Sequence, residues 1–156
     1  GWAAQALSDR PAAPPGTRLL VEGRVGVSVP ASWTVERVTA GPGSARVRVA
    51  DGGGLPALHI TQADGVPATV PEVAETLWKA IESETPGVFV DFDAGGERAG
   101  RPVVTYLERR TDSQTRWSVL VDGTLRIAIG CQSAPGQQSA VEGVCDEAVR
   151  SARAVR

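Results

Sequence analysis

The residues most able to do chemistry are the two cysteines, Cys131 and Cys145. An alternating run over Leu125–Gly130 predicts that Cys131 ends a strand, and Cys145 falls on the apolar side of a helix predicted from about Gly136 to Val155. Two lone cysteines that flank one strand-to-helix connection favour a disulfide, and disulfides are typical of secreted or cell-envelope domains. Closing a loop of about 15 residues stabilises a fold by roughly 3 kcal/mol. Two reduced cysteines buried in the core are the alternative.

His59 is the single histidine, and it alternates with Leu58 and Ile60 on a predicted strand. A Ser, Cys or Asp in a nucleophile motif such as Gly-x-Ser-x-Gly is missing, so a solvated or core-edge histidine is favoured over a catalytic base. A zinc site is disfavoured because His59 and the cysteines offer no second pair of ligands. We therefore expect no catalytic residue, no metal ligand and no cofactor. A hydrolase assembled around His59 is the least favoured alternative.

Asp91, Asp93 and Glu97 surround Gly95-Gly96 in a spacing that faintly resembles a calcium-binding loop. The pattern lacks the ligand at the fifth loop position and the glutamate at the twelfth. We interpret the segment as a glycine-rich turn between strands.

Three tryptophans fall inside predicted elements. Trp78 lies on the apolar side of a predicted helix, and Trp117 shares a strand face with Val119 and Val121, so both are expected in the core. Trp33 follows Pro30 at a strand entry. Core packing is favoured for Trp33 too, but it is the one aromatic residue that we identify as a possible partner-facing anchor.

The composition is that of an ordinary globular domain. The 156 residues are 42% hydrophobic and 22% charged, with a formal net charge of −2, and a chain of this length can bury one substantial core. The slight acidity and the lack of a basic run argue against a nucleic-acid partner. No window approaches the run of about 20 apolar residues that a membrane span needs. The chain begins at Gly1 without an initiator Met, so we expect a fragment whose membrane tether lies upstream.

Prolines and period-2 alternation divide the first part of the chain. Residues 1–17, which end in a Pro/Ala-rich stretch, are predicted to be a linker, and residues 18–156 a single α+β domain. Alternation predicts an antiparallel meander of strands at Leu19–Val21, Arg24–Val29, Trp33–Val38, Ser44–Val49 and Ala57–Gln62.

Helical spacing then replaces alternation between Val70 and Ile81. Thr69 and Glu72 form a capping-box pattern at its start, and Pro86-Gly87 ends it. Asp122-Gly123, between two later runs, predicts a type I′ hairpin. The remaining strands are predicted at Val88–Phe92, Pro102–Arg109, Thr115–Val121 and Leu125–Cys131. Together the elements predict a mostly antiparallel sheet covered by helices, which is an α+β fold, without settling whether the helices share a face.

A series of short motifs runs through the folded part of the chain. They are Leu19–Val25 (LLVEGRV), Val29–Trp33 (VPASW), Gly41–Arg46 (GPGSAR), Pro86–Phe92 (PGVFVDF), Ala99–Tyr106 (AGRPVVTY), Trp117, Val121–Gly123 (VDG) and Ile129–Gln132 (IGCQ). In order and number they resemble the C-terminal domain of the actinobacterial type VII secretion-associated protein family, encoded at ESX-class loci of mycobacteria and relatives. The resemblance covers about residues 19–155. A more distant similarity, carried by the Val-Pro-x-x-Trp motif and the two cysteines, is to small mycobacterial lipoproteins with a PsbP-like α/β/α sandwich.

The resemblance implies a membrane-anchored domain on the extracytoplasmic side of the membrane, with type VII secretion components as partners. It brings no catalytic residues. The preferred hypothesis is therefore a non-enzymatic accessory or interaction domain. The alternative is a cell-envelope domain that binds a small ligand or a lipid in a cavity between sheet and helix.

Overall fold

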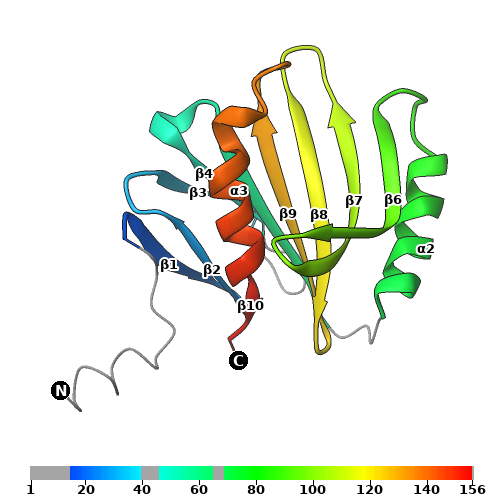
Figure 1. Ribbon diagram of the computed structural model, residues 1–156, viewed down its shortest axis with the longest axis horizontal. Coiled ribbons are helices and arrows are strands. Elements are labelled where there is room, and N and C mark those ends of the chain that lie inside the picture. Colours follow the sequence, from blue (N-terminus) through cyan, green and yellow to red (C-terminus); the bar gives the residue numbers. More distant parts are fainter. Residues whose placement is uncertain (1–14, 40–45, 65–68, 156) are drawn as a thin grey trace.

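A computed structural model describes residues 15–39, 46–64 and 69–155 (Figure 1). Its main element is a seven-stranded antiparallel sheet with the order β3-β4-β5-β9-β8-β7-β6. The strands are β3 Thr34–Thr39, β4 Arg46–Ala50, β5 Ala57–Ala63, β6 Phe89–Arg98, β7 Arg101–Arg109, β8 Gln114–Asp122 and β9 Leu125–Ser133. A short 3-10 turn, η1, spans Asp51–Gly53 between β4 and β5.

A separate three-stranded sheet contains β1 Thr17–Glu22, β2 Val25–Pro30 and β10 Arg153–Ala154, in the order β1-β2-β10. The predicted single meander is therefore wrong, because β1 and β2 pair with the end of the chain instead of with β3. Side chains join the two sheets near the β1–β2 turn. Gln62 of β5 donates to the Glu22 carbonyl at 2.8 Å and accepts from the Arg24 amide at 2.9 Å, and Glu22 pairs with Arg37 at 2.8 Å.

The two helices cover opposite faces of the large sheet. Helix α3, Ser139–Ser151, packs with β2 on one face, and its buried residues join the main core. That core is built from alternate residues of the strands, including Val47, Val49, Leu58, Ile60, Leu120, Leu125, Ile127 and Ile129. Helix α2, Val70–Glu82, covers the other face near the β6 edge, where Val73 and Ala74 pack on Val104 and Val119 (Figure 1). The predicted α+β sheet covered by helices is confirmed, and its layers are α/β/α.

Local signals explain most of the boundaries. Helix α2 begins with the predicted capping box, in which the Thr69 hydroxyl accepts from the Glu72 amide and the Glu72 carboxylate accepts from the Thr69 amide. The predicted hairpin joins β8 to β9, but Asp122 belongs to β8. The two-residue loop is Gly123 and Thr124, with Gly123 at φ +62°, so the expected type I′ placement of Asp122-Gly123 is wrong by one residue.

Two predicted segments differ from the structure. Gly95-Gly96 does not form a turn but lies inside β6, where register shifts near Asp93 absorb the irregular sequence, as β-bulges do. The turn comes later, at Ala99 and Gly100, both at positive φ. The last helix ends at Ser151 and not near Val155, because Arg153 and Ala154 pair with β2.

The linker predicted for residues 1–17 falls mostly on residues 1–14, which lie outside the described residues. Its last residue, Thr17, is already the first residue of β1.

Candidate functional site: a charged cleft beside the disulfide

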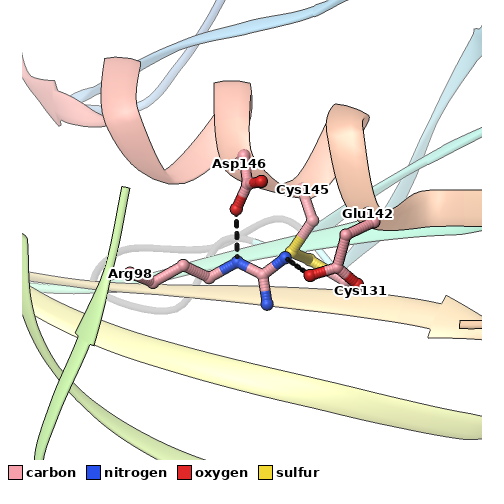
Figure 2. The surroundings of a disulfide bond; sticks show 5 residues. All are labelled: Arg98, Cys131, Glu142, Cys145 and Asp146. Atoms are coloured by element: carbon pink, nitrogen blue, oxygen red, sulfur yellow. Dashed lines mark hydrogen bonds and ion pairs between the residues drawn. A yellow bond between two sulfur atoms is a disulfide. The ribbon is translucent and has the colours of Figure 1, made fainter. Parts of the chain in front are cut away.

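Cys131 and Cys145 form a disulfide between β9 and α3, as Figure 2 shows. Cys131 is one of the alternate β9 residues that face α3, and Cys145 lies on the apolar side of α3; both are buried. The predicted disulfide is thus confirmed, and the alternative of two reduced cysteines is not. It fixes the middle of α3 to the centre of the sheet.

Arg98, at the end of β6, reaches over the sheet to α3 beside this disulfide. Its Nη2 lies 2.9 Å from Glu142 Oε1, and its Nε lies 3.0 Å from Asp146 Oδ1 (Figure 2). Glu142 and Asp146 are four residues apart, so both carboxylates project from one side of the helix. The Arg98 side chain is only 17% exposed, whereas Glu142 and Asp146 are 59% and 42% exposed. The guanidinium therefore lies deeper than its two partners.

Two adjoining cavities, of about 260 Å³ and about 370 Å³, lie between α3 and strands β6 to β9. Both are lined by Arg98, Arg116 and Glu142. We call the combined space the α3 cleft. Its other polar lining residues are Glu97, Thr105, Gln114, Ser118, Ser133, Gln138 and Asp146.

The sheet supplies the floor of the α3 cleft. Arg116 and Ser118 are alternate residues of β8, so they project from the same face, and Thr105 of β7 is paired directly with Ser118. Arg116 Nη2 lies 2.8 Å from Asp91 Oδ2, a carboxylate at the solvent-exposed β6 edge. Within the described part of the chain the buried Ser118 hydroxyl has no hydrogen-bond partner. The floor thus offers a guanidinium and two hydroxyls.

The chemistry available in the α3 cleft is the binding of charged and polar groups. Its cysteine is held in the disulfide, and the single imidazole of the chain is on the other face of the sheet, so Ser118 has no imidazole as a base. A lipid tail requires a predominantly apolar lining, whereas the α3 cleft mixes apolar residues such as Leu107 and Val141 with charged ones.

His59 lies on the face opposite α3, where it is only 8% exposed. Its Nε2 is 2.7 Å from Gln132 Oε1, and its Nδ1 is 3.2 Å from Arg46 Nη2. Gln132 in turn donates to the Ser113 hydroxyl at 3.0 Å. Burial lowers the pKa of His59 below its ordinary 6.5; the Gln132 hydrogen bond opposes this change, and the charges of Arg46 and Arg48 add to it. His59 is a buried, hydrogen-bonded residue and not a solvated one.

The tryptophans differ in their placement. Trp117 is buried as predicted, with its indole against Gly130, where an added Cβ would lie 2.8 Å from the ring. Trp33 is partly buried and packs against the main core; its proposed role toward a partner stays a prediction. Trp78 is 47% exposed, so its expected place in the core is wrong. It contacts Phe92 on β6 at the edge of the sheet, where one side of α2 faces solvent.

The acidic residues of the glycine-rich segment have separate partners. Asp91 pairs with Arg116, and Asp93 accepts from the Gly95 amide at 2.9 Å, while Glu97 lines the α3 cleft. The described residues contain no group of three or more His, Cys, Asp or Glu placed to hold a metal ion.

Sequence reasoning missed Arg98, Arg116 and Ser118. The sequence signal points the other way: Arg116 and Ser118 alternate with Trp117, Val119 and Val121, and such alternation is typical of an antiparallel strand with one solvated face. In the structure α3 covers that face, and Ser118 is 1% exposed. Polar side chains on a buried face need partners. The sequence does not identify those partners, because Arg98 meets Glu142 across 44 positions.

No helix among the described residues is long and apolar enough to cross a membrane.

Comparisons with known proteins bear on the fold. No protein-family model and no curated protein sequence matches the chain. The structure is similar to CyanoP, the cyanobacterial PsbP of Synechocystis, with a TM-score of 0.60 and 15% identity over 91% of this chain and 94% of that one. A Bacteroides thetaiotaomicron protein is similar with a TM-score of 0.54 and 12% identity, over 90% of this chain. The match spans 49% of that protein, about half its length.

The likeness to CyanoP shows a PsbP-like fold and confirms that part of the resemblance. The resemblance to the type VII secretion-associated family rests on the sequence motifs alone.

Proposed function

We propose that this chain is a non-enzymatic, extracytoplasmic accessory domain that binds a partner protein through the α3 cleft, and that the partner belongs to a type VII secretion system. The observation that carries the proposal is the α3 cleft itself: paired charges and an unpartnered hydroxyl beside a disulfide-fixed helix. The type VII association is supported by the sequence motifs, and the extracytoplasmic location by the disulfide, since disulfides persist in oxidising compartments.

Binding is favoured over catalysis by the arrangement of the groups. Nucleophilic catalysis needs a nucleophile within hydrogen-bond reach of a base. Ser118 and His59 lie on opposite faces of the sheet, and the His59 ring is hydrogen-bonded to Arg46 and Gln132. A disulfide-fixed helix over a rigid sheet is instead suited to present charges in a constant geometry.

The proposal is tested by affinity purification from actinobacterial cells after in vivo cross-linking, with wild-type protein and an Arg98→Gln/Arg116→Gln variant. We expect the wild-type protein to recover secretion-system components and the variant to recover much less. Equal recovery by both proteins would contradict the role of the α3 cleft. Repeated recovery of other envelope proteins alone would contradict the type VII association.

A small polar ligand is a second candidate, favoured by cavity volumes of about 260 Å³ and about 370 Å³, near the lower end of ligand sites. Screening polar metabolites for a rise in melting temperature separates the two candidates. A saturable rise that is lost in Arg116→Gln would support this second function.

A further inference from the structure

The Ser118 hydroxyl is the most informative polar group of the α3 cleft. Ser118 is 1% exposed, its hydroxyl has no partner within the described residues, and it lines the larger of the two cavities. Folded proteins satisfy nearly all their buried polar groups, because an unpaired one forfeits its hydrogen bonds to water. A hydroxyl left unpaired at the edge of a cavity is therefore available to hydrogen-bond a ligand that enters that cavity.

The groups around Ser118 define the charge of that ligand. Arg116 lies two residues from Ser118 on the same face, and Thr105 is the direct cross-strand neighbour of Ser118. Arg98 covers the same cavity from the α3 side. Two guanidiniums and two hydroxyls can all donate hydrogen bonds. These donors are suited to an anionic acceptor, and the carboxylates of Glu97, Glu142 and Asp146 line the same cavity.

The carboxylates of the cleft lie toward solvent. Glu142 and Asp146 are 59% and 42% exposed, and Asp91, the partner of Arg116, is 70% exposed. An exposed carboxylate loses little when its ion pair opens, because water solvates the released charge. A buried arginine, by contrast, needs an anion at all times. Another carboxylate can therefore replace Glu142 or Asp146 on Arg98 with little net change in buried charge.

We infer that the α3 cleft binds a carboxylate from an acidic peptide segment of the partner, held by Arg116 and Arg98 with hydrogen bonds from Ser118 and Thr105, while Glu142 and Asp146 move to solvent. A carboxylate matches the planar guanidinium in a two-point contact. A dianion such as phosphate is disfavoured by Glu97, Glu142 and Asp146 in the lining. This inference rests on the proposed partner-binding function and names the chemistry that the site recognises.

The test is a two-dimensional NMR titration of the purified ¹⁵N-labelled domain. The probes are acetyl-Gly-Gly-Glu-Gly-Gly-amide for a side-chain carboxylate, acetyl-Gly-Gly-Gly with a free carboxyl end, and acetyl-Gly-Gly-Gln-Gly-Gly-amide as the neutral control. We expect saturable shifts of the Ser118 and Thr105 amides and of the Arg98 Nε–H, with a dissociation constant on the order of 1 mM. Whichever carboxylate probe binds more tightly identifies a side-chain or a chain-end source.

Variants distinguish a binding role from a structural one. Ser118→Ala should weaken peptide binding by about threefold to tenfold while the melting temperature stays equal or rises, because an unpaired hydroxyl has been removed. Glu142→Gln should tighten binding, because a competing carboxylate is gone; a cation site would respond in the opposite direction. Arg126→Gln is the matched control, since Arg126 alternates with Ile127 and projects from the opposite face.

Equal shifts from the glutamate and glutamine peptides, or unsaturable shifts from both carboxylate probes, would overturn the inference. So would a Ser118→Ala variant that binds as well as the wild type. If cells yield a partner that depends on Arg98 and Arg116 but the peptides do not bind, the inference fails and the proposed function stands. If the peptides bind and no partner is recovered, the proposed function fails instead.

Discussion

At the scale of single residues, burial is the main reason that the His59 ring stays neutral, and the positive charge of Arg46 acts in the same direction. A neutral ring with its proton on Nε2 donates to Gln132 and accepts from Arg46. A protonated ring would turn Nδ1–H toward the Arg46 guanidinium, so that two donors and two positive charges would meet. This geometry agrees with the direction in which burial moves the pKa.

The lowered pKa of His59 predicts a pH dependence of stability. Below pH 6.5 the unfolded chain binds a proton at His59 that the folded protein excludes until its own, lower pKa is reached. The stability contributed by the neutral ring is therefore complete above pH 6.5 and is lost as pH falls through the folded pKa. Urea unfolding from pH 7.5 to 5 should show this loss, and His59→Gln should flatten the curve. Parallel curves for the two proteins would contradict the prediction.

The same scale shows what sequence reasoning can reach. The disulfide was predictable because the chain has two cysteines and both fall at positions where burial is expected. Ser118 was not, because its significance is the lack of a partner, which depends on the positions of β7 and α3. Arg98 was missed for a related reason: its ion pairs join elements that are distant in the sequence.

At the scale of elements, the start of α2 was predicted from four residues. The capping box of Thr69 and Glu72 satisfies backbone amides that have no partner within the helix. Thr69→Ala should lower the free energy of unfolding by about 1 kcal/mol. Thr76→Ala is the matched control in the same helix, where the loss should stay below about 0.5 kcal/mol. Chemical denaturation measures both, and equal losses would contradict a specific capping role.

Helix α3 is fixed along its length by separate contacts. The disulfide holds its middle, Arg98 binds its exposed side, and Arg101 Nη1 donates to the carbonyls of Val149 and Ala152 at its end. Arginine near a helix C-terminus satisfies carbonyls that the helix leaves unpaired. The α3 cleft therefore has a roof that is held at several points.

Among these substitutions, removal of the disulfide should cause the largest loss of stability. The Cys131→Ala/Cys145→Ala variant should lose about 3 kcal/mol of stability, since the bond closes a loop with a separation of 14 residues. Equilibrium unfolding with and without reductant measures the loss. Reductant should destabilise the wild type by a similar amount and leave the variant unchanged, and a variant as stable as the oxidised wild type would contradict the prediction.

At the scale of the whole molecule, the fold class followed from periodicity, but the division into two sheets did not. Alternation in Arg24–Val29 and Trp33–Val38 predicts strands and gives no information on which edges meet. The pairing of β2 with β10 depends on a two-residue strand after α3, too short for a period to be seen.

The role of β10 gives a prediction for the whole domain. Ending the chain after Ala152 removes the pairing with β2, the 2.7 Å bond from the Ala154 amide to Asp122, and the 2.9 Å bond from the Val155 amide to the Arg24 carbonyl. We expect a loss of about 1–3 kcal/mol in unfolding free energy.

Gly26→Ala supplies the coupling test, because its new Cβ would lie 2.5 Å from Val155 Cγ1. The substitution should be more damaging in the full chain than in the shortened one. If the changes in unfolding free energy from Gly26→Ala and from the truncation were additive, Val155 would not pack on β2.

The order β1-β2-β10 also determines how the domain responds to mechanical force. Both outer strands run antiparallel to β2, so tension applied between the start of β1 and the end of β10 acts on the small sheet in shear. Once β10 has detached, α3 can unwind only as far as Cys145, where the disulfide passes the tension directly to β9. The segment between the cysteines bears no tension, and its extended length of about 40 Å is added to the stretched chain only when the disulfide is reduced. The thiol state thus sets how far the domain can be stretched.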